Sequence, residues 1–209
     1  MMFYIVFIIA VVLSYLIGAI PTGYLMAKIF KGIDIRQFGS SNVGATNVYR
    51  VVGKLPGFAT LVLDALKGVL VVAVIAGYTY SFVDILDYDF YRSLLGLIAI
   101  CGHIWPVFLG FKGGKGVATT IGVLSIIAPV PLILSLLIWL VIFSLTNYVS
   151  LASIIFGIFL PVFSVILNES LYITLLAVTI CIINSYKHSS NIKRLLKGEE
   201  NKTILFKKK

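Results

Sequence analysis

Long apolar runs constrain this chain more than any other feature of its sequence. A helix of about 20 apolar residues crosses the hydrocarbon core of a bilayer, and such runs follow one another from Phe3 to Ser185. Hydrophobic residues make up 60% of the chain and charged residues 12%, which excludes a soluble globular enzyme, a disordered chain and a disulfide-rich scaffold. The sequence therefore predicts an all-α polytopic membrane protein, with residues 1–209 forming a single integral membrane domain.

Seven transmembrane helices are predicted from these runs. The apolar stretches cover residues 3–26, 55–78, 94–109, 117–145, 151–167 and 171–185. The fourth stretch is too long for one span and contains Pro129 and Pro131. Because prolines break helices, we divide it there into two short spans. A five-span arrangement, in which the short middle pieces re-enter the membrane, is the alternative.

The basic residues predict the orientation of these spans. If the N-terminus lies outside, the inner segments hold fifteen of the 17 basic residues. They are Lys28, Lys31, Arg36, Arg50, Lys54, Lys112, Lys115 and the eight from Lys187 to Lys209. Because Lys and Arg gather on the cytoplasmic side of membrane proteins, we expect the N-terminus outside and the C-terminus in the cytoplasm. The net charge of +9 then reflects topology and attraction to anionic lipid, with no role in binding nucleic acid.

Three further features exclude simple alternatives. The N-terminal run has no basic segment before it and no small-residue cleavage pattern, which predicts a retained helix and not a removed signal. Cys101 and Cys181 lie inside apolar runs, so we expect small core residues without a disulfide. With two His and two Cys, the chain has little material for a zinc site, and no metal is predicted.

Residues 36–54 form the first of three polar segments on the predicted cytoplasmic side. Its glycines allow backbone N–H groups to approach a ligand closely, and an arginine offers a planar fork suited to phosphate. The candidate binding residues are Ser40, Asn42, Thr46, Asn47 and Arg50. The alternative is an ordinary loop whose arginine only sets the topology.

Residues 110–117 form the second polar segment, a glycine-rich loop that leads into a helix. Exposed N–H groups, the positive end of a helix dipole and two lysines are typical of an anion site. The candidate residues are Gly113, Gly114, Lys115 and Gly116. The loop is one residue too short for a Walker A motif, and Gly116 stands where Ser or Thr would bind magnesium, so phosphate is predicted and ATP is not. The alternative is a flexible linker.

Residues 187–200 form the third polar segment. His188 and Asn191 are three residues apart, which predicts that they share one face of a helix emerging from the last span. The alternative is a solvated basic tail.

Two polar groups outside these segments also bear on the prediction. Asp64 and Lys67, at i and i+3 within the second run, are predicted to form a structural ion pair that braces the first segment, with direct catalysis as the alternative. Asn147, Tyr148 and Ser153 are interpreted as helix-capping residues, with pocket lining as the alternative.

The three segments together indicate a ligand that carries one or two phosphates and is reached from the cytosol and from the lipid. The chain has no G-x-S-x-G elbow, no acidic pair for glycoside chemistry and no H-x₄-D motif after His103 or His188. An enzyme of this kind would act by positioning and charge stabilisation. A transporter of a small organic phosphate is the alternative, although no duplicated half is evident. The glycine-rich segments argue against a purely structural or regulatory protein.

The segments also resemble a known family. The strings GSSNVGATNVYRVVGK, GHIWPVFLGFKGGKGVATTIG and KHSSNIKRLLKGEE are similar, in order and spacing, to the three motifs of the bacterial acyl-phosphate-dependent glycerol-3-phosphate acyltransferases (PlsY). The resemblance runs from end to end of the chain. Two departures are Ser41, where the family more often has Gly, and Lys187, where Arg is common. Neither position is one that we expect to be catalytic.

The resemblance implies an acyl transfer from acyl phosphate to the sn-1 hydroxyl of glycerol 3-phosphate. The products would be lysophosphatidic acid and inorganic phosphate, in the first step of bacterial phospholipid synthesis. It implies that Ser40, Arg50, Lys115, His188 and Asn191 are the catalytic and phosphate-gripping residues. Asn42, Thr46 and Asn47 would shape the pocket, and Gly113, Gly114 and Gly116 would bind phosphate beside Lys115.

The resemblance also bears on the general base, on cofactors and on location. His188, His103 and a phosphate oxygen of the substrate are all candidates for the base. No cofactor is implied. We expect a monomer in the bacterial cytoplasmic membrane, with its active site facing the cytoplasm.

Overall fold

The computed structural model describes residues 1–203, which divide into two compact units. The units are Met1–Ile127 and Ala128–Lys209. Throughout the described residues the regular structure is helical and contains no strand, as predicted. Lys207, Lys208 and Lys209, which were counted with the cytoplasmic basic residues, lie outside the described residues.

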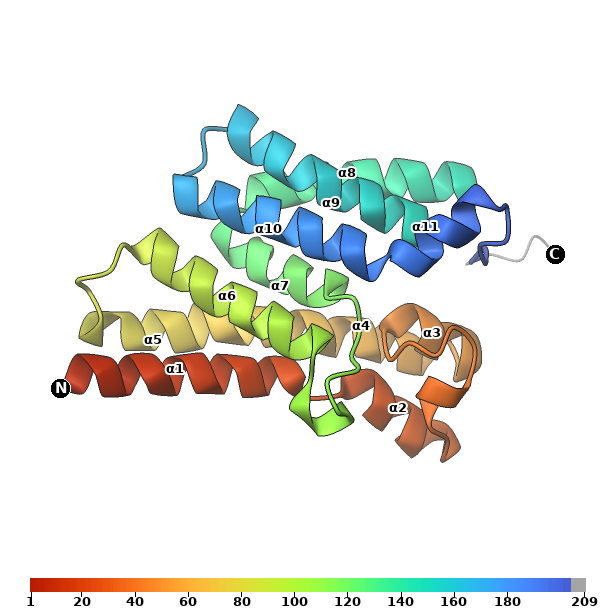
Figure 1. Cartoon of the computed structure of the whole chain (residues 1–209), viewed down its shortest axis with the longest axis horizontal. Coiled ribbons are helices and arrows are strands. Elements are labelled where there is room, and N and C mark those ends of the chain that lie inside the picture. The colour runs from red at the N-terminus through yellow and green to blue at the C-terminus, as the bar shows by residue number, and fades with distance from the viewer. Residues whose placement is uncertain (204–209) are drawn as a thin grey trace. The chain divides into compact units, whose positions relative to one another are not determined.

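The first unit is built from seven α-helices in its described residues. They are α1 (Met2–Ala19), α2 (Thr22–Lys31), α3 (Ala45–Val51), α4 (Lys54–Val69), α5 (Gly77–Thr79), α6 (Tyr88–Ile104) and α7 (Val117–Ile127). A π-helical segment, Leu70–Ala76, joins α4 to α5, and 3-10 turns cover Ile35–Gln37, Tyr80–Phe82 and Val107–Leu109. Helix α1 packs along α6, and α4 packs along α7 (Figure 1).

Glycines bring these helix pairs into close contact. Gly18 of α1 lies against the backbone of Ala99 in α6, and Gly122 of α7 lies against the backbone of Ala65 in α4. A Cβ atom at either glycine would overlap the neighbouring helix. Close backbone approach favours helix association in a membrane, where burial of apolar side chains from lipid contributes little.

The first predicted span, residues 3–26, is two helices in the structure. Helix α1 ends at Ala19 and α2 begins at Thr22, with Ile20 and Pro21 between them. Proline has no N–H to donate and its ring clashes with a preceding helical turn, so the helix ends before Pro21. This break places Thr22 at the start of α2, where its side chain is buried.

Five helical segments of the described residues are long and apolar enough to cross a membrane. They are Met2–Lys31, Lys54–Phe82, Tyr88–Leu109, Pro129–Thr146 and Val149–Ile166, and the bent pair Leu171–Lys187 and Ser189–Leu196 would make six. Helix α7 has 11 residues, and at 1.5 Å per residue it is about 16 Å long, shorter than the hydrocarbon core. The chain is therefore a multi-pass integral membrane protein.

The predicted break near Pro129 is confirmed. Helix α7 ends at Ile127, and α8 begins with Pro129 as its first residue. Pro131 does not interrupt α8, because it lies in the first turn, where no intrahelical N–H donor is required.

The second unit contains α8 (Pro129–Thr146), α9 (Val149–Ile166), α10 (Leu171–Lys187) and α11 (Ser189–Leu196). Helices α8 and α10 each pack against α9 (Figure 1). Asn147 ends α8 in a left-handed conformation with φ 60°, and Tyr148 precedes α9. These positions confirm the helix-capping interpretation for both residues.

A helix does emerge from the last span, as predicted, with His188 as its N-cap and Asn191 within it, but it does not continue the direction of α10. Helices α10 and α11 meet at His188 with a bend of 59°. Neither proline nor glycine lies at the bend, so the local sequence carries no signal for it.

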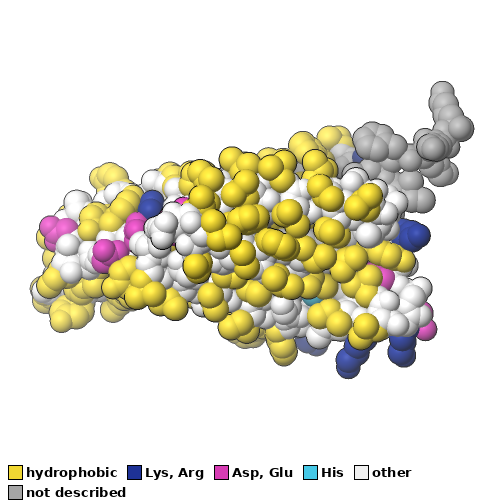
Figure 2. Space-filling model, turned by 90° about the horizontal axis from the view of Figure 1, so that it is seen from above, with side chains coloured by type: hydrophobic (Ala, Val, Ile, Leu, Met, Phe, Trp, Pro, Cys, Tyr) yellow, Lys and Arg dark blue, Asp and Glu magenta, His cyan; other side chains and the backbone are white. Residues whose placement is uncertain are grey.

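Figure 2 shows one face of the molecule, which hydrophobic side chains cover for the most part. Among the exposed side chains are Ile8, Leu140 and Val165, with 59%, 56% and 63% of their surface accessible. Exposed apolar side chains of this number are unfavourable in water and favourable against lipid.

Candidate active site

Asn47 organises the first polar segment from a buried position. Its Oδ1 accepts a hydrogen bond from the N–H of Ser40 at 2.9 Å, and its Nδ2 donates to the carbonyl oxygens of Phe38 at 3.0 Å and Asn42 at 2.8 Å. Gly39 has a φ of 62°, and the Asn47 carboxamide lies where a Cβ of Gly39 would be. Asn47 therefore holds the loop in its conformation by binding three of its backbone groups.

The polar side chains of this segment differ in their exposure. Ser40 and Arg50 are exposed, whereas Asn42 and Thr46 are half-buried. The Oδ1 of Asn42 accepts from the N–H of Gly44 at 2.8 Å, just before α3. Arg50 lies in the last turn of α3, where a positive charge is favourable. The segment thus exposes the Ser40 hydroxyl and the Arg50 side chain next to a backbone that Asn47 and Asn42 hold in place.

An ion pair stands at the start of the same segment. Nη2 of Arg36 lies 2.7 Å from Oδ2 of Asp34, and the hydrogen bond from this guanidinium holds the pKa of Asp34 below its ordinary value. The guanidinium also lies over the ring of Tyr24, 5.5 Å from its centroid. Arg36 is therefore bound by Asp34 and Tyr24 within its own unit.

The second polar segment folds back on the last turn of α6. The N–H of Gly113 donates to the carbonyl oxygen of Ile104, and the N–H of Gly114 donates to that of His103, both at 3.1 Å. A Cβ at Gly113 would overlap the His103 carbonyl and Pro106, and a Cβ at Gly114 would overlap the His103 ring. The expectation that these two N–H groups are exposed to an anion is therefore wrong, because both already have backbone acceptors.

Lys115 and Gly116 lie at the junction of this loop with α7. Gly116 adopts a φ of 83° immediately before α7, and its carbonyl accepts the N–H of Thr120 at 2.8 Å. Lys115, the preceding residue, is half-buried. The lysine thus lies beside the N-terminal end of a helix, where partial positive charge accumulates.

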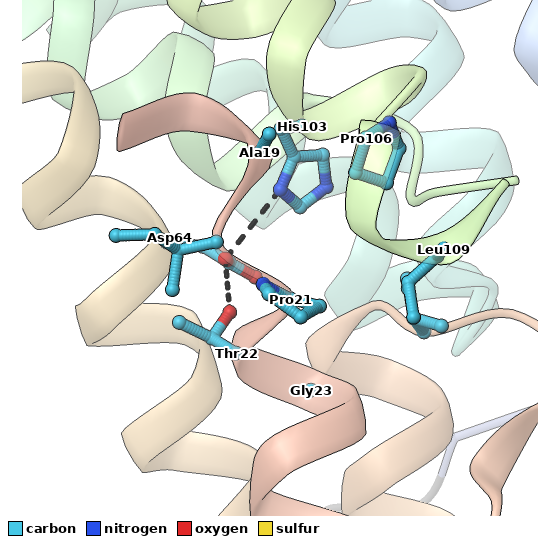
Figure 3. Close-up of a pocket in the computed structure, with 10 residues that line it drawn as sticks. Ala19, Pro21, Thr22, Gly23, Asp64, His103, Pro106 and Leu109 are labelled. Atoms are coloured by element: carbon cyan, nitrogen blue, oxygen red, sulfur yellow. Dashed lines mark hydrogen bonds and ion pairs between the residues drawn. The ribbon is translucent and has the colours of Figure 1, made fainter. Parts of the chain in front are cut away.

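His103, which contacts this loop, belongs to a buried polar cluster, and Figure 3 shows three of its residues, Thr22, Asp64 and His103. Asp64 and Lys67 form the predicted ion pair, with Nζ 2.7 Å from Oδ1. The same Oδ1 accepts a hydrogen bond from the hydroxyl of Thr22 and lies 3.4 Å from Nδ1 of His103. Lys67 also donates to the carbonyl oxygen of Ile20. The cluster therefore ties the α1–α2 break to α4 and α6.

The predicted role of the ion pair, bracing the first segment, needs a correction. Its direct partners are Ile20, Thr22 and His103, which belong to the α1–α2 break and to α6. The first segment reaches this region through Val43, which lines the same small cavity as Asp64 and His103. No local pattern marks Thr22 or His103 as partners of Asp64, because they lie 42 and 39 residues away from it in the chain.

The third polar segment, in the second unit, is held by a carboxylate that the sequence analysis did not single out. Oε1 of Glu200 accepts from the hydroxyl of Ser150 at 2.9 Å and from Nδ2 of Asn191 at 2.7 Å, while Oε2 accepts from Nε of Arg194 at 2.7 Å. Burial, the largest single influence, would raise the pKa of Glu200, but these hydrogen bonds outweigh it and hold the pKa below its ordinary value. An acidic residue at the end of a basic stretch was the available signal.

His188 is held by the helix that precedes it. Its ring Nδ1 lies 2.9 Å from the carbonyl oxygen of Asn184, which can only accept, so Nδ1 carries the proton. Nδ2 of Asn184 donates to the carbonyl oxygen of Ser153 at 2.7 Å, and Nε1 of Trp139 donates to the Ser153 hydroxyl at 3.2 Å. Ser153 therefore joins α8, α9 and α10 from within α9, and the interpretation of this residue as a helix cap is wrong.

The predicted site residues are distributed over both units. Ser40, Asn42, Thr46, Asn47, Arg50, Gly113, Gly114, Lys115 and Gly116 belong to the first unit, and His188 and Asn191 to the second. Within the first unit, Val43 of the first segment lines a small cavity together with His103, Pro106 and Leu109, which precede the second segment in the chain. Within the second unit, Asn191 is oriented by Glu200 and His188 by Asn184.

A multi-pass helical membrane protein with glycine-rich, basic polar segments is the class that these observations define. The family model described as "Glycerol-3-phosphate acyltransferase" matches residues 8–198. A glycerol-3-phosphate acyltransferase of Fusobacterium nucleatum is 43% identical over 192 residues, covering 92% of this chain and 95% of the relative. One from Staphylococcus saprophyticus is 44% identical over 197 residues, covering 93% and 96%.

Two solved structures are also similar to this chain. Both are of PlsY (YgiH), an integral membrane glycerol 3-phosphate acyltransferase, and both share 39% identity with it. The glycerol 3-phosphate form has a TM-score of 0.85 and covers 95% of this chain and 96% of its own. The lysophosphatidic acid form has a TM-score of 0.83 and covers 95% of each. The chain belongs to the glycerol-3-phosphate acyltransferase family, which confirms the resemblance and favours an enzyme over a transporter.

Proposed function

We propose that this enzyme transfers a fatty acyl group from an acyl phosphate to the sn-1 hydroxyl of glycerol 3-phosphate. The observation that carries the proposal is family membership over nearly the whole chain, with matching fold. The solved relatives are named for their glycerol 3-phosphate and lysophosphatidic acid forms, which are the acceptor and the product of such a transfer. An acyl phosphate is already activated, so the reaction needs little covalent help from the protein.

The acyl transfer breaks one bond and forms another. The primary hydroxyl oxygen of glycerol 3-phosphate attacks the acyl carbonyl carbon, and the bond from that carbon to the phosphate oxygen breaks. The proton of the hydroxyl passes to a base, for which a phosphate oxygen is one candidate and His188 another. Inorganic phosphate leaves, and the catalytic requirement is to hold two anions together and neutralise the leaving charge.

We assign Lys115 to the phosphate at the reacting centre, with Gly113, Gly114 and Gly116 as its supporting loop. The position of Lys115 beside the start of α7 supports this assignment. Because the Gly113 and Gly114 N–H groups are bonded to α6, the side chain of Lys115 carries more of the binding than those amides do.

Ser40, Arg50, His188 and Asn191 are assigned mainly to glycerol 3-phosphate. The exposure of Ser40 and Arg50 on a fixed loop supports the first pair. The hydrogen bonds that orient His188 and Asn191 support the second pair. Asn42, Thr46 and Asn47 shape the loop around them, which agrees with the backbone contacts of Asn42 and Asn47.

We further propose a single membrane domain of seven spans, with the N-terminus outside and the C-terminus cytoplasmic. The distribution of basic residues supports this topology. Helix α7, with 11 residues, leaves the five-span alternative open to experiment. The enzyme would act as a monomer in the bacterial cytoplasmic membrane, with its active site facing the cytoplasm and without a cofactor.

The test is phosphate release by the detergent-purified protein given palmitoyl phosphate, without metal or nucleotide. We expect release that depends on glycerol 3-phosphate, with an equal amount of lysophosphatidic acid. Lys115→Ala, measured in parallel, separates catalysed release from spontaneous hydrolysis. No release from palmitoyl phosphate, together with glycerol 3-phosphate flux in liposomes, would overturn the proposal in favour of a transporter.

A further inference from the structure

His103 lies between a fixed carboxylate and the glycine-rich loop. Its Nδ1 faces Oδ1 of Asp64 at 3.4 Å, as Figure 3 shows. A carboxylate only accepts hydrogen bonds, so the nitrogen that faces it carries the proton. Asp64 itself is held by Thr22 and Lys67, and both Asp64 and His103 are buried. One edge of the imidazole is therefore fixed from below.

The opposite edge of the same ring supports the loop. A methyl group at Gly114 would overlap Nε2 of His103 and would lie 2.9 Å from Cε1 and 3.0 Å from Cδ2. The backbone of His103 contributes as well, because its carbonyl oxygen accepts the N–H of Gly114 at 3.1 Å. The loop thus rests directly on the ring, one residue before Lys115.

We propose that His103 is a positioning residue, whose ring, oriented by Asp64, fixes the 113–116 loop and thereby the place of Lys115. This inference rests on the proposed function for its catalytic consequence, although the contact itself does not depend on the substrate. Both ring nitrogens face protein groups, so the geometry favours positioning over the general-base role left open for His103. Glycine at position 114 is then required by the ring beneath it, since any Cβ would displace the loop.

The test combines His103→Asn with a control on the same helix. Asn retains a nitrogen that can donate to Asp64 but removes the outer part of the ring. Tyr91→Phe removes a buried hydroxyl that lies 2.7 Å from the Thr79 hydroxyl, twelve residues from His103, or about 18 Å along the helix. The two variants alter side chains of α6 at different distances from the loop.

Amide hydrogen exchange and steady-state kinetics are measured on each purified variant. We expect the Gly113 and Gly114 amides to exchange at least tenfold faster in His103→Asn, and kcat/KM for glycerol 3-phosphate to fall at least tenfold. In Tyr91→Phe both values should stay at the wild-type level, even if Tm falls. Unchanged loop exchange in folded His103→Asn would overturn the proposal, whether or not activity is lost.

A second test changes Gly114, the loop residue that contacts the His103 ring, alone and together with His103→Asn. In the wild-type background, Gly114→Ala should speed amide exchange at Gly113 and lower kcat/KM. In the His103→Asn background, where the smaller side chain leaves space for the added methyl group, both effects should be at least fivefold smaller. Equal effects in both backgrounds would overturn the proposal. If His103→Asn does not fold, normal amide exchange at Gly113 in the Gly114→Ala single variant would overturn the proposal.

The outcome is separable from that of the proposed function. Failure of the wild-type enzyme to use palmitoyl phosphate would refute the acyl transfer. The exchange measurement needs no substrate, so it would still decide whether the ring fixes the loop.

Discussion

Removal of the Glu200 carboxylate is predicted to destabilise the second unit and to disturb Asn191. Glu200 is buried and accepts three hydrogen bonds, from Ser150, Asn191 and Arg194. A buried donor that loses its acceptor lowers the unfolding free energy by about 1–3 kcal/mol. Glu200→Ala removes the acceptor of two such donors, Ser150 and Asn191. The side chain of Arg194 is 34% exposed, so water can replace its lost partner, and the broken ion pair contributes little to the loss of stability.

The expected loss is therefore about 3 kcal/mol of unfolding free energy, which corresponds to a fall of about 6–12 °C in Tm for a chain of this size. Thermal unfolding of the detergent-purified protein measures it. Glu199→Ala is the matched control, because its side chain is exposed and should change stability by less than about 0.5 kcal/mol. A Glu200→Ala protein as stable as Glu199→Ala would refute the reasoning.

The lowered pKa of Glu200 adds a pH dependence to the same prediction. A carboxyl whose pKa is lower in the folded than in the unfolded state stabilises the fold above its unfolded pKa, and this contribution is lost as pH falls through the folded pKa. Glu200→Gln keeps an acceptor but no charge. We expect its Tm to be below that of the wild type at neutral pH, and the difference to shrink as pH falls below about 4.3, the ordinary glutamate value. A Tm difference independent of pH would contradict this assignment.

Three further predictions follow from the first unit. Lys115→Ala should lose most of the acyl transfer while Tm stays near the wild-type value, because an unneutralised phosphate leaves poorly; near-normal kcat in a phosphate-release assay would contradict it. Asn47→Ala should lower the unfolding free energy by about 2–4 kcal/mol, since three bonded backbone groups of the loop lose their partner, and thermal unfolding beside Thr46→Ala as control checks it. Gly122→Val should lower the yield of folded protein by forcing α7 from α4, with Gly77→Ala, where nothing is within 4 Å of the added Cβ, as the control in size-exclusion chromatography.

The features that could be predicted from sequence depend on residues close together in the chain. Hydropathy identified the apolar helices, and Pro129 marked a real break because proline acts on its own helix. The ion pair of Asp64 and Lys67 was predictable because i and i+3 positions share a helix face. The break at Pro21 was missed, since apolar residues on both sides hid the loss of helical hydrogen bonds.

The features that could not be predicted depend on contacts between residues far apart in the chain. The bend at His188 has no local breaker. Glu200 gains its importance from Ser150, fifty residues away, as well as from Asn191 and Arg194. Composition also misled at Gly113 and Gly114. A run of glycines beside lysines suggests free N–H groups for an anion, but glycine is equally required where a backbone must pass close to another group.

Glycine is required in this loop for two different reasons, close approach to another group and a positive φ, and they apply at different positions. At Gly113 and Gly114 the N–H groups point to α6 carbonyls and the missing side chains make room for the His103 carbonyl and ring. At Gly116 the positive φ of 83° is itself the requirement, because it starts α7 directly after Lys115. Two backbone hydrogen bonds and the close contact with the His103 ring hold this loop against α6. Under the proposed function, a loop held in this way would place Lys115 at the leaving phosphate in advance, and pre-positioned charge costs no reorganisation during the reaction.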